Sequence, residues 1–194
     1  MDRNSQHRFR AVVLGVSSGG VEALKLVIGS LPADFTLPVM VVAHISPEAD
    51  NGLALLLDEL CAIRVKEADE LEKAAAGTVY LAPPNYHLQV EKDATLSLSV
   101  DPPVRFARPS VDVLFEAAAD AFGPALIGVV MTGAGNDGSE GLRRIKDAGG
   151  VTVVQDPAGA LVDSMPASAI EAVAPDYIVP LERIAPLLVR LATQ

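Results

Sequence analysis

Short apolar runs alternate with longer amphipathic stretches along most of this chain. Three runs are almost wholly aliphatic and have the length of buried strands, at 11–16, 39–45 and 125–132. After the first run, apolar residues recur at helical spacing over 20–31, and Pro32 ends that pattern. Because buried strands alternate with helices, the pattern predicts a parallel sheet with helices on both faces.

Further runs continue this alternation to the C-terminus. We expect additional strands at 63–67, 78–82, 151–155 and 177–179, and helices at 53–61, 110–122, 139–148, 166–173 and 181–192. The segment 83–105 departs from the pattern, because short strands at 87–90 and 96–100 flank Lys92-Asp93 and predict a β-hairpin. The predicted fold class is α/β: a doubly wound, mostly parallel sheet with helices on both faces and a β-hairpin excursion in the middle.

The chain is expected to form one folded domain. Half of its 194 residues are hydrophobic, and it shows no internal repeat or linker. Aromatic residues make up 4% and tryptophan is absent, so the core must be aliphatic. We expect residues 1–8, which are polar and charged, to be a disordered tail, and 9–194 to form the domain.

Charge and composition exclude several classes of function. The formal net charge of −10 argues against a nucleic-acid partner, because phosphate contacts need a basic face. The single cysteine, Cys61, permits neither an internal disulfide nor a thiolate metal site, and we predict no metal and no cofactor. No apolar run reaches the roughly 20 residues of a membrane-spanning helix, and the polar start does not resemble a secretory signal. We expect a soluble cytoplasmic protein without membrane insertion.

A candidate nucleophile follows the first strand. Ser17 lies in Gly15-Val16-Ser17-Ser18-Gly19, which matches G-x-S-x-G, and between a strand and a helix this pattern can form a nucleophile elbow. The backbone N–H groups near Ser18 and Gly19 would then face the site and can bind an oxyanion. The alternative interpretation is an ordinary Gly/Ser turn at the start of a helix.

A candidate general base follows the second strand. The chain has three histidines, of which His7 lies in the tail and His87 in the hairpin. Only His44 ends a buried strand, where a base must lie to reach Ser17. The alternative is a histidine that merely packs at the end of the strand.

A candidate carboxylate follows the strand at 125–132. Asp137 lies in a glycine-rich loop, and in a catalytic triad such a carboxylate orients the imidazole and stabilises its protonated form. The alternative is that Asp137 is the N-cap of the following helix, a position that Asp favours. For the helix at 110–122, the expected N-cap is Ser110. The order Ser, His, Asp differs from that of α/β-hydrolases, so an ordinary lipase or esterase fold is not expected.

The same loop suggests a competing function. Gly133 to Gly138 is a literal G-x-G-x-x-G between a strand and a helix, and Asp156 follows 18 residues later, as in a dinucleotide fingerprint. Asp137, however, would place a negative charge where a pyrophosphate binds. The 56 residues after Gly138 are also too few for a second mononucleotide half. A non-catalytic signalling module of the same fold is a further alternative.

Several motifs occur together in a recognisable order. They are 15–20 (GVSSGG), Ala43-His44, 65–68 (VKEA), 108–115 (RPSVDVLF), 131–138 (MTGAGNDG) and Met165-Pro166. On these motifs, from about Arg10 to the C-terminus, the chain resembles the catalytic domain of CheB, the bacterial chemotaxis protein-glutamate methylesterase.

The resemblance implies an activity and a site. It implies a triad of Ser17, His44 and Asp137 that hydrolyses glutamate γ-methyl esters on the cytoplasmic helices of methyl-accepting chemoreceptors. Water resolves the acyl-enzyme, and the same route would deamidate receptor glutamines. It also implies that residue 134, here Ala134, helps to form the substrate pocket and oxyanion region.

Departures from the family pattern concern the fit of the substrate and the regulation of activity. The family usually has Thr where this chain has Ser18, Met where it has Ala134, and Arg where it has Leu56. The family also normally carries an N-terminal receiver domain. No receiver precedes the domain in this sequence, so we expect constitutive activity that a phosphodonor does not raise. Local positive charge toward an acidic receptor would come from Arg64, Arg105 and Arg108.

Overall fold

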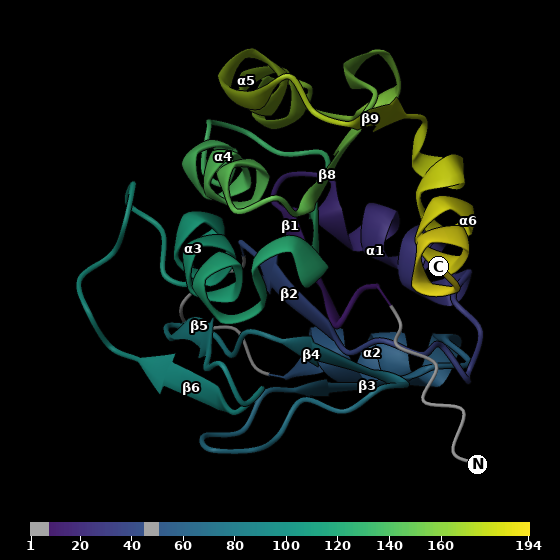
Figure 1. Cartoon of the computed structure of the whole chain (residues 1–194), viewed down its shortest axis with the longest axis vertical. Helices are drawn as coiled ribbons and strands as arrows, with labels where there is room; N and C mark the ends of the chain where they lie inside the picture. Colours follow the sequence, from purple (N-terminus) through teal and green to yellow (C-terminus); the bar gives the residue numbers. More distant parts are fainter. Residues whose placement is uncertain (1–7, 45–50) are drawn as a thin grey trace.

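The computed structural model describes residues 8–44 and 51–194, so residues 1–7 of the expected tail at 1–8 and residue 45 of the expected strand at 39–45 lie outside the described residues. A parallel sheet forms the centre, with strand order β3-β4-β2-β1-β7-β8-β9 (Figure 1). Its strands are β1 (Ala11–Val16), β2 (Val39–Ala43), β3 (Arg64–Glu67), β4 (Thr78–Leu81), β7 (Leu126–Val130), β8 (Val151–Gln155) and β9 (Tyr177–Val179). The predicted fold class is confirmed.

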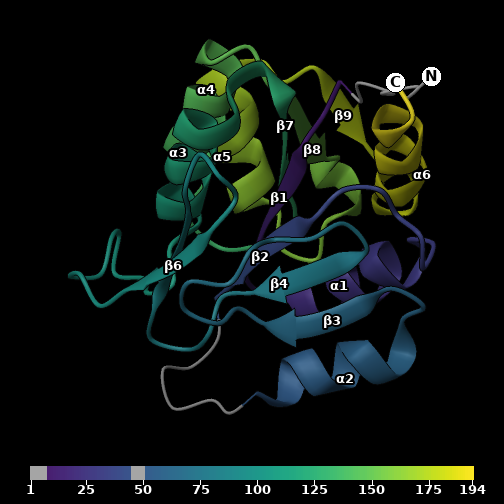
Figure 2. The same ribbon diagram turned by 60° about the horizontal axis from the view of Figure 1, so that its bottom comes forward.

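Helices cover both faces of this sheet (Figure 2). They are α1 (Gly20–Gly29), α2 (Gly52–Leu60), α3 (Val111–Phe122), α4 (Ser139–Asp147), α5 (Ser164–Val173) and α6 (Leu181–Ala192), with short 3₁₀ turns η1 (Gly123–Ala125) and η2 (Pro157–Gly159). Alternate residues of a strand face opposite sides. In β1, Val12 and Leu14 therefore join the core under α1, α2 and α6, while Ala11 and Val13 join the core under α3, α4 and α5.

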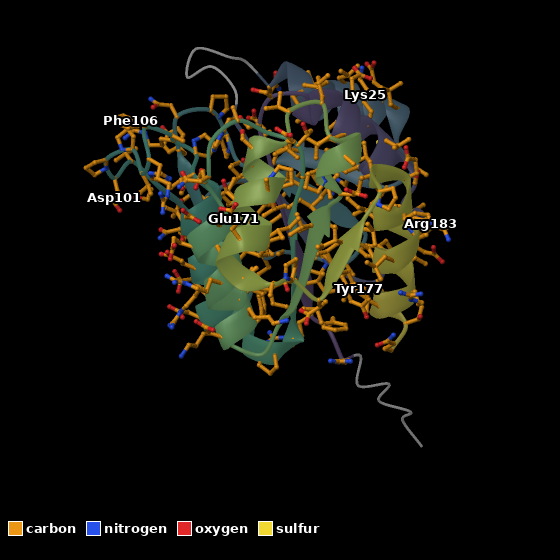
Figure 3. All side chains as sticks on the ribbon, turned by 90° about the horizontal axis from the view of Figure 1, so that it is seen from above. Lys25, Asp101, Phe106, Glu171, Tyr177 and Arg183 are labelled. Carbon is orange, nitrogen blue, oxygen red and sulfur yellow. The ribbon has the colours of Figure 1, made fainter. Side chains whose placement is uncertain are left out.

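The predicted hairpin is present and lies against the second of these cores. Strands β5 (His87–Val90) and β6 (Leu96–Ser99) pair antiparallel as a separate two-stranded sheet. Leu88 and Leu96 are buried against α3 and its neighbours. The segment 100–109, which connects β6 to α3, projects from the body with Asp101 and Phe106 at its outer edge (Figures 2 and 3).

The strand order places the chemistry-bearing loops together. Strand β1 lies between β2 and β7, so the chain leaves β1 toward one side of the sheet and later returns on the other side. Such a switch point, beyond the carboxyl ends of the strands, is where open α/β sheets bind ligands. Ser17, His44 and Met131 directly follow the ends of β1, β2 and β7 there.

Several predicted boundaries were wrong by one or two residues. The helix expected over 20–31 ends at Gly29, and the helix expected from 166 begins at Ser164, since proline is tolerated in a first turn. The strand expected over 125–132 spans Leu126–Val130, because Gly123–Ala125 forms the turn η1. These shifts do not change which residues end the strands at the switch point.

Candidate active site

Ser17 is held in a tight connection between β1 and α1. Its backbone N–H donates to the carbonyl of Thr132 at 3.0 Å, which fixes the loop to the end of β7. Its carbonyl accepts from Gly20 N at 2.7 Å, which closes the turn into the helix. Gly19 has φ of 80°, a left-handed conformation that glycine adopts without steric cost. The G-x-S-x-G pattern thus forms the strand–turn–helix that the sequence predicted.

Several backbone N–H groups around this loop have no acceptor among the described residues. They include those of Ser18 and Gly19, just before α1, and that of Ala134, in the loop after β7. Free N–H groups at a helix N-terminus attract negative charge. They are the donors available to an oxyanion here.

His44 lies beside the serine loop because of strand register. Val16 pairs with Ala43, and His44 N donates to the carbonyl of Val16 at 3.1 Å, so Ser17 and His44 follow paired residues of adjacent strands. The ring Nε2 of His44 contacts Asp137 Oδ2 at 2.8 Å. With the carboxylate as acceptor, Nε2 carries the proton and Nδ1 is free to accept one.

The structure joins two of the three predicted side chains directly. Within the described residues, no hydrogen bond connects the Ser17 hydroxyl to the His44 ring, so Ser17 is placed by register and loop geometry. In proteins without bound substrate, such catalytic hydrogen bonds are often long or poorly aligned. The arrangement therefore keeps Ser17, His44 and Asp137 as candidates for one site.

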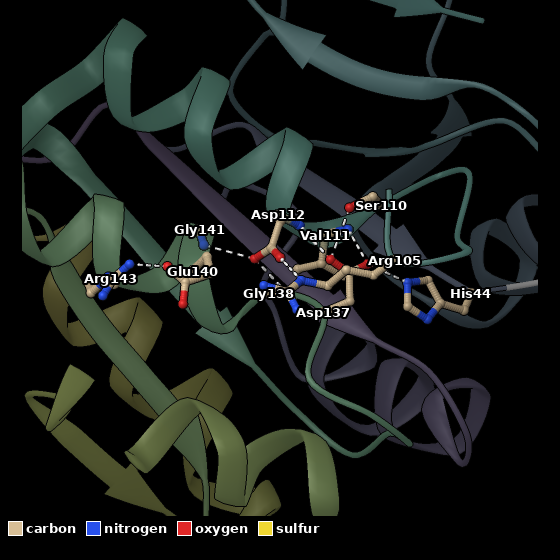
Figure 4. A network of polar contacts seen from close by, with 10 residues as sticks. All are labelled: His44, Arg105, Ser110, Val111, Asp112, Asp137, Gly138, Glu140, Gly141 and Arg143. Atoms are coloured by element: carbon tan, nitrogen blue, oxygen red, sulfur yellow. Dashed lines mark hydrogen bonds and ion pairs between the residues drawn. The ribbon is translucent and has the colours of Figure 1, made fainter. Parts of the chain in front are cut away.

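Asp137 is buried and lies at the N-terminus of α3 (Figure 4). Besides His44, three donors contact its carboxylate: the Ser110 hydroxyl at 2.9 Å, Val111 N at 2.8 Å and Asp112 N at 2.9 Å. Burial acts to raise the pKa of Asp137, but the bonds from His44 and from the helix amides outweigh it and lower the pKa. Asp137 is thus held as a carboxylate, the form that a triad requires.

Asp112 performs the corresponding role for α4. Its carboxylate accepts from Gly138 N at 2.9 Å and Gly141 N at 2.8 Å, and from Arg105 Nε at 2.9 Å. Burial and the nearby charge of Asp137 raise the pKa of Asp112. Asp137, just before α4, therefore caps the N-terminus of α3, and Asp112, in the first turn of α3, caps the N-terminus of α4. We call this arrangement the reciprocal cap.

The reciprocal cap corrects three expectations. Ser110 does not cap α3 with its own side chain, because its hydroxyl donates to Asp137 instead. Asp137 is not the N-cap of α4, a position that Gly138 occupies. The dinucleotide interpretation of Gly133 to Gly138 is also wrong, because the carboxylate of Asp112 fills the α4 N-terminus where a pyrophosphate would bind.

A cavity of about 320 Å³ opens beside the imidazole–carboxylate pair. Its lining residues come from three segments: His44, Arg105, Phe106, Ala107, Arg108, Pro109, Ala134, Gly135, Asn136 and Asp137. Of the three arginines expected to supply positive charge, Arg105 and Arg108 line this cavity, whereas Arg64 lies at the start of β3. Two arginines thus line the cavity although the chain as a whole is acidic.

His87, which the sequence placed only in the hairpin, supports the same region. Its Nδ1 accepts from Ser110 N at 3.2 Å, and its Nε2 contacts the carbonyl of Pro102 at 3.3 Å. The ring therefore ties β5 to the start of α3 and to the projecting segment. Sequence reasoning missed this role and that of Asp112, because both depend on packing between distant elements. The motif at 108–115 includes Asp112 but does not show what its side chain contacts.

Among the described residues, no group of three His, Cys, Asp or Glu side chains could hold a metal ion. In the same parts of the chain, no helix is long and apolar enough to cross a membrane.

A doubly wound parallel sheet with a serine loop and an imidazole–carboxylate pair at its switch point is typical of a hydrolytic enzyme. A family model described as CheB methylesterase matches residues 12–188. The chain belongs to the CheB methylesterase family.

Individual relatives agree with this assignment. A Leptospira interrogans protein, provisionally named protein-glutamate methylesterase/protein-glutamine glutaminase, is 49% identical over 94% of this chain and 95% of its own length. The protein-glutamate methylesterase FrzG of Myxococcus xanthus is 40% identical over 92% of this chain and 54% of its own length. The crystal structure of the Thermotoga maritima CheB methylesterase catalytic domain is similar with a TM-score of 0.90 at 34% identity, over 94% of this chain and 98% of that chain.

Proposed function

We propose that this chain hydrolyses glutamate γ-methyl esters on the cytoplasmic helices of chemoreceptors, with Ser17 as nucleophile, His44 as base and Asp137 as its orienting carboxylate. One observation carries the proposal. Nε2 of His44 contacts the buried carboxylate of Asp137 at 2.8 Å, at the end of a strand whose register places His44 beside the serine loop. The names of the relatives supply the substrate class.

Acylation uses each of these groups once. Ser17 Oγ attacks the ester carbonyl and its proton passes to Nδ1 of His44, while Asp137 stabilises the imidazolium that forms. The N–H groups of Ser18, Gly19 and Ala134 are the donors for the oxyanion. Collapse of the tetrahedral intermediate breaks the bond to methoxide, which takes the proton from His44 and leaves as methanol.

Deacylation repeats the sequence with water. His44 accepts a proton from the attacking water, the acyl–serine bond breaks, and Ser17 regains its proton as the glutamate carboxylate is released. A glutamine side chain can enter the same route with ammonia as the leaving group. The proposed function therefore includes deamidation of receptor glutamines without a second site.

Methanol release from methyl-labelled chemoreceptor membranes tests the proposal. Wild type should release methanol, and Ser17→Ala should lose about 10³-fold or more in rate, because the acyl-enzyme cannot form. The matched control is Ser30→Ala, since Ser30 is an exposed serine whose hydroxyl donates to the Leu26 carbonyl at 2.7 Å. Ser17→Ala that retains the wild-type rate would refute the assigned nucleophile, and no release by wild type would refute the substrate class.

A further inference from the structure

The segment that borders the cavity ends in a tight turn with an unusual backbone. Val104 and Ala107 exchange two backbone hydrogen bonds, at 3.0 Å and 2.9 Å, around Arg105 and Phe106. These two central residues have φ of 49° and 66°. Two-residue turns with positive φ at both positions favour Asn and Gly, because a larger side chain is strained there. Arg105 and Phe106 are therefore held in a left-handed backbone conformation that neither residue type favours.

The strain presents an aromatic ring to solvent. Phe106 is fully exposed, at 104%, and lies at the outer edge of the projecting segment (Figure 3). Val100 and Val104 in the same segment are also exposed. Aromatic side chains are enriched among the residues that dominate binding at protein interfaces. A strained, exposed aromatic beside a candidate active site suggests a role in binding.

The turn is anchored rather than loose. Arg105 Nε donates to the buried carboxylate of Asp112, and His87 holds the carbonyl of Pro102. Arg108 donates to Asn85 Oδ1 and to the carbonyls of Val100 and Asp101. An anchored turn offers its side chains in a fixed position, which reduces the entropy lost on binding.

Arg108 brings a charge that the described residues do not neutralise. All of its hydrogen-bond acceptors are neutral oxygens, an amide and two carbonyls, and it forms no ion pair in the described parts of the chain. Because Arg108 and Phe106 line the same cavity as His44, a side chain entering that cavity would bring its neighbours against the turn. The turn thus combines an apolar anchor with an unpaired cation at the entrance.

We propose that residues 104–108, which we call the docking turn, bind the acidic stretch of the protein substrate around the target glutamate. Phe106 packs against an apolar position of the substrate helix, and Arg108 pairs with a carboxylate on it. Every cycle of ester hydrolysis leaves one carboxylate on the substrate, so the chain, with its net charge of −10, needs such local positive charge to hold it. This inference rests on the proposed function.

Steady-state kinetics on two substrates test the docking turn. One is methylated chemoreceptor membrane, and the other is a blocked glutamate γ-methyl ester, which lacks the neighbouring residues of the substrate helix. We expect Phe106→Gly to raise KM for the receptor about tenfold with kcat within about twofold, and to raise KM for the small ester far less, because that ester brings no neighbouring helix residues to the turn. Because glycine relieves the positive φ, this variant should be at least as stable as wild type. Arg108→Gln should raise the same KM.

Matched controls come from elsewhere in the chain. Leu71 is also an exposed apolar residue, at 73%, with a positive φ of 64°, so Leu71→Ala should leave KM for the receptor unchanged. Arg183→Gln, on the exposed side of α6, is the control for charge.

The outcomes separate the two proposals. If wild type releases methanol from receptors while Phe106→Gly and Arg108→Gln keep its KM, the docking turn is refuted and the proposed function stands. Equal losses on both substrates would make the turn a structural element and also refute it. If wild type releases no methanol from receptors, the proposed function fails and the docking turn fails with it.

Discussion

Gly133 lies so close to the serine loop that no side chain fits between them. A Cβ atom built at this position would lie 2.5 Å from Met165 Sδ and 2.7 Å from Ser17 Cβ. Gly133→Ala should therefore displace Ser17, with a loss of at least about 100-fold in methanol release. We also expect a loss of roughly 1–3 kcal/mol in the free energy of unfolding, measured in urea.

Gly159→Ala is the control for this substitution, because a Cβ there meets nothing within 4 Å. Wild-type activity in Gly133→Ala would show that the approach of the two loops is not needed for the position of Ser17.

At the residue scale, the sequence predicted the candidate residues that directly follow buried strands or lie in the loops after them. Ser17, His44 and Asp137 each follow an apolar run, so their convergence at the switch point could be inferred from the alternation alone. The bonds of Asp112 and His87 could not be inferred, because their partners lie 7 to 29 residues away along the chain and meet them only through packing. The contact between Ser17 and His44 remains a prediction.

At the scale of elements, the reciprocal cap should contribute strongly to stability. Asp112→Ala would leave the N–H groups of Gly138 and Gly141 and the guanidinium of Arg105 without their acceptor. We expect it to lower the free energy of unfolding by about 3 kcal/mol, because a buried charge partner is lost. Asp112→Asn, which keeps one acceptor oxygen, should cost less.

Asp120→Ala is the comparison on the same helix. Asp120 pairs with Arg144 at 2.7 Å at an exposed position, so its loss should cost at most about 1 kcal/mol. Urea unfolding of the three variants provides the measurement. Equal effects for Asp112→Ala and Asp120→Ala would contradict a stabilising role for the reciprocal cap.

Element types were easier to predict from the sequence than element ends. The ranges of β1, β8, β9 and α6 were predicted to the residue, because apolar periodicity and Gly or Pro bound them clearly. The start of α3 at Val111 was close to expectation, but its cap was not, since the capping carboxylate comes from Asp137 rather than from the preceding residue. Capping by a distant side chain leaves no local signal.

At the scale of the whole molecule, the chemistry is expected to proceed without a metal. The described residues contain no candidate cluster of ligands, and the proposed steps use only protein groups and water. Millimolar EDTA should therefore leave both methanol release and the thermal midpoint of unfolding unchanged. A loss of activity that is restored by adding back a divalent cation would contradict this expectation.

The reciprocal cap also constrains how this protein can evolve. Asp137 caps the N-terminus of α3 and is also proposed to orient His44. If hydrolysis is lost in evolution, substitution of Ser17 should therefore cost little folding stability, whereas substitution of Asp137 should cost much more. We therefore expect descendants that survive only as binding partners to retain the aspartate and to lose the serine. In such a protein, the presence of Asp137 would reflect its role in stabilising the fold and would not indicate catalytic activity.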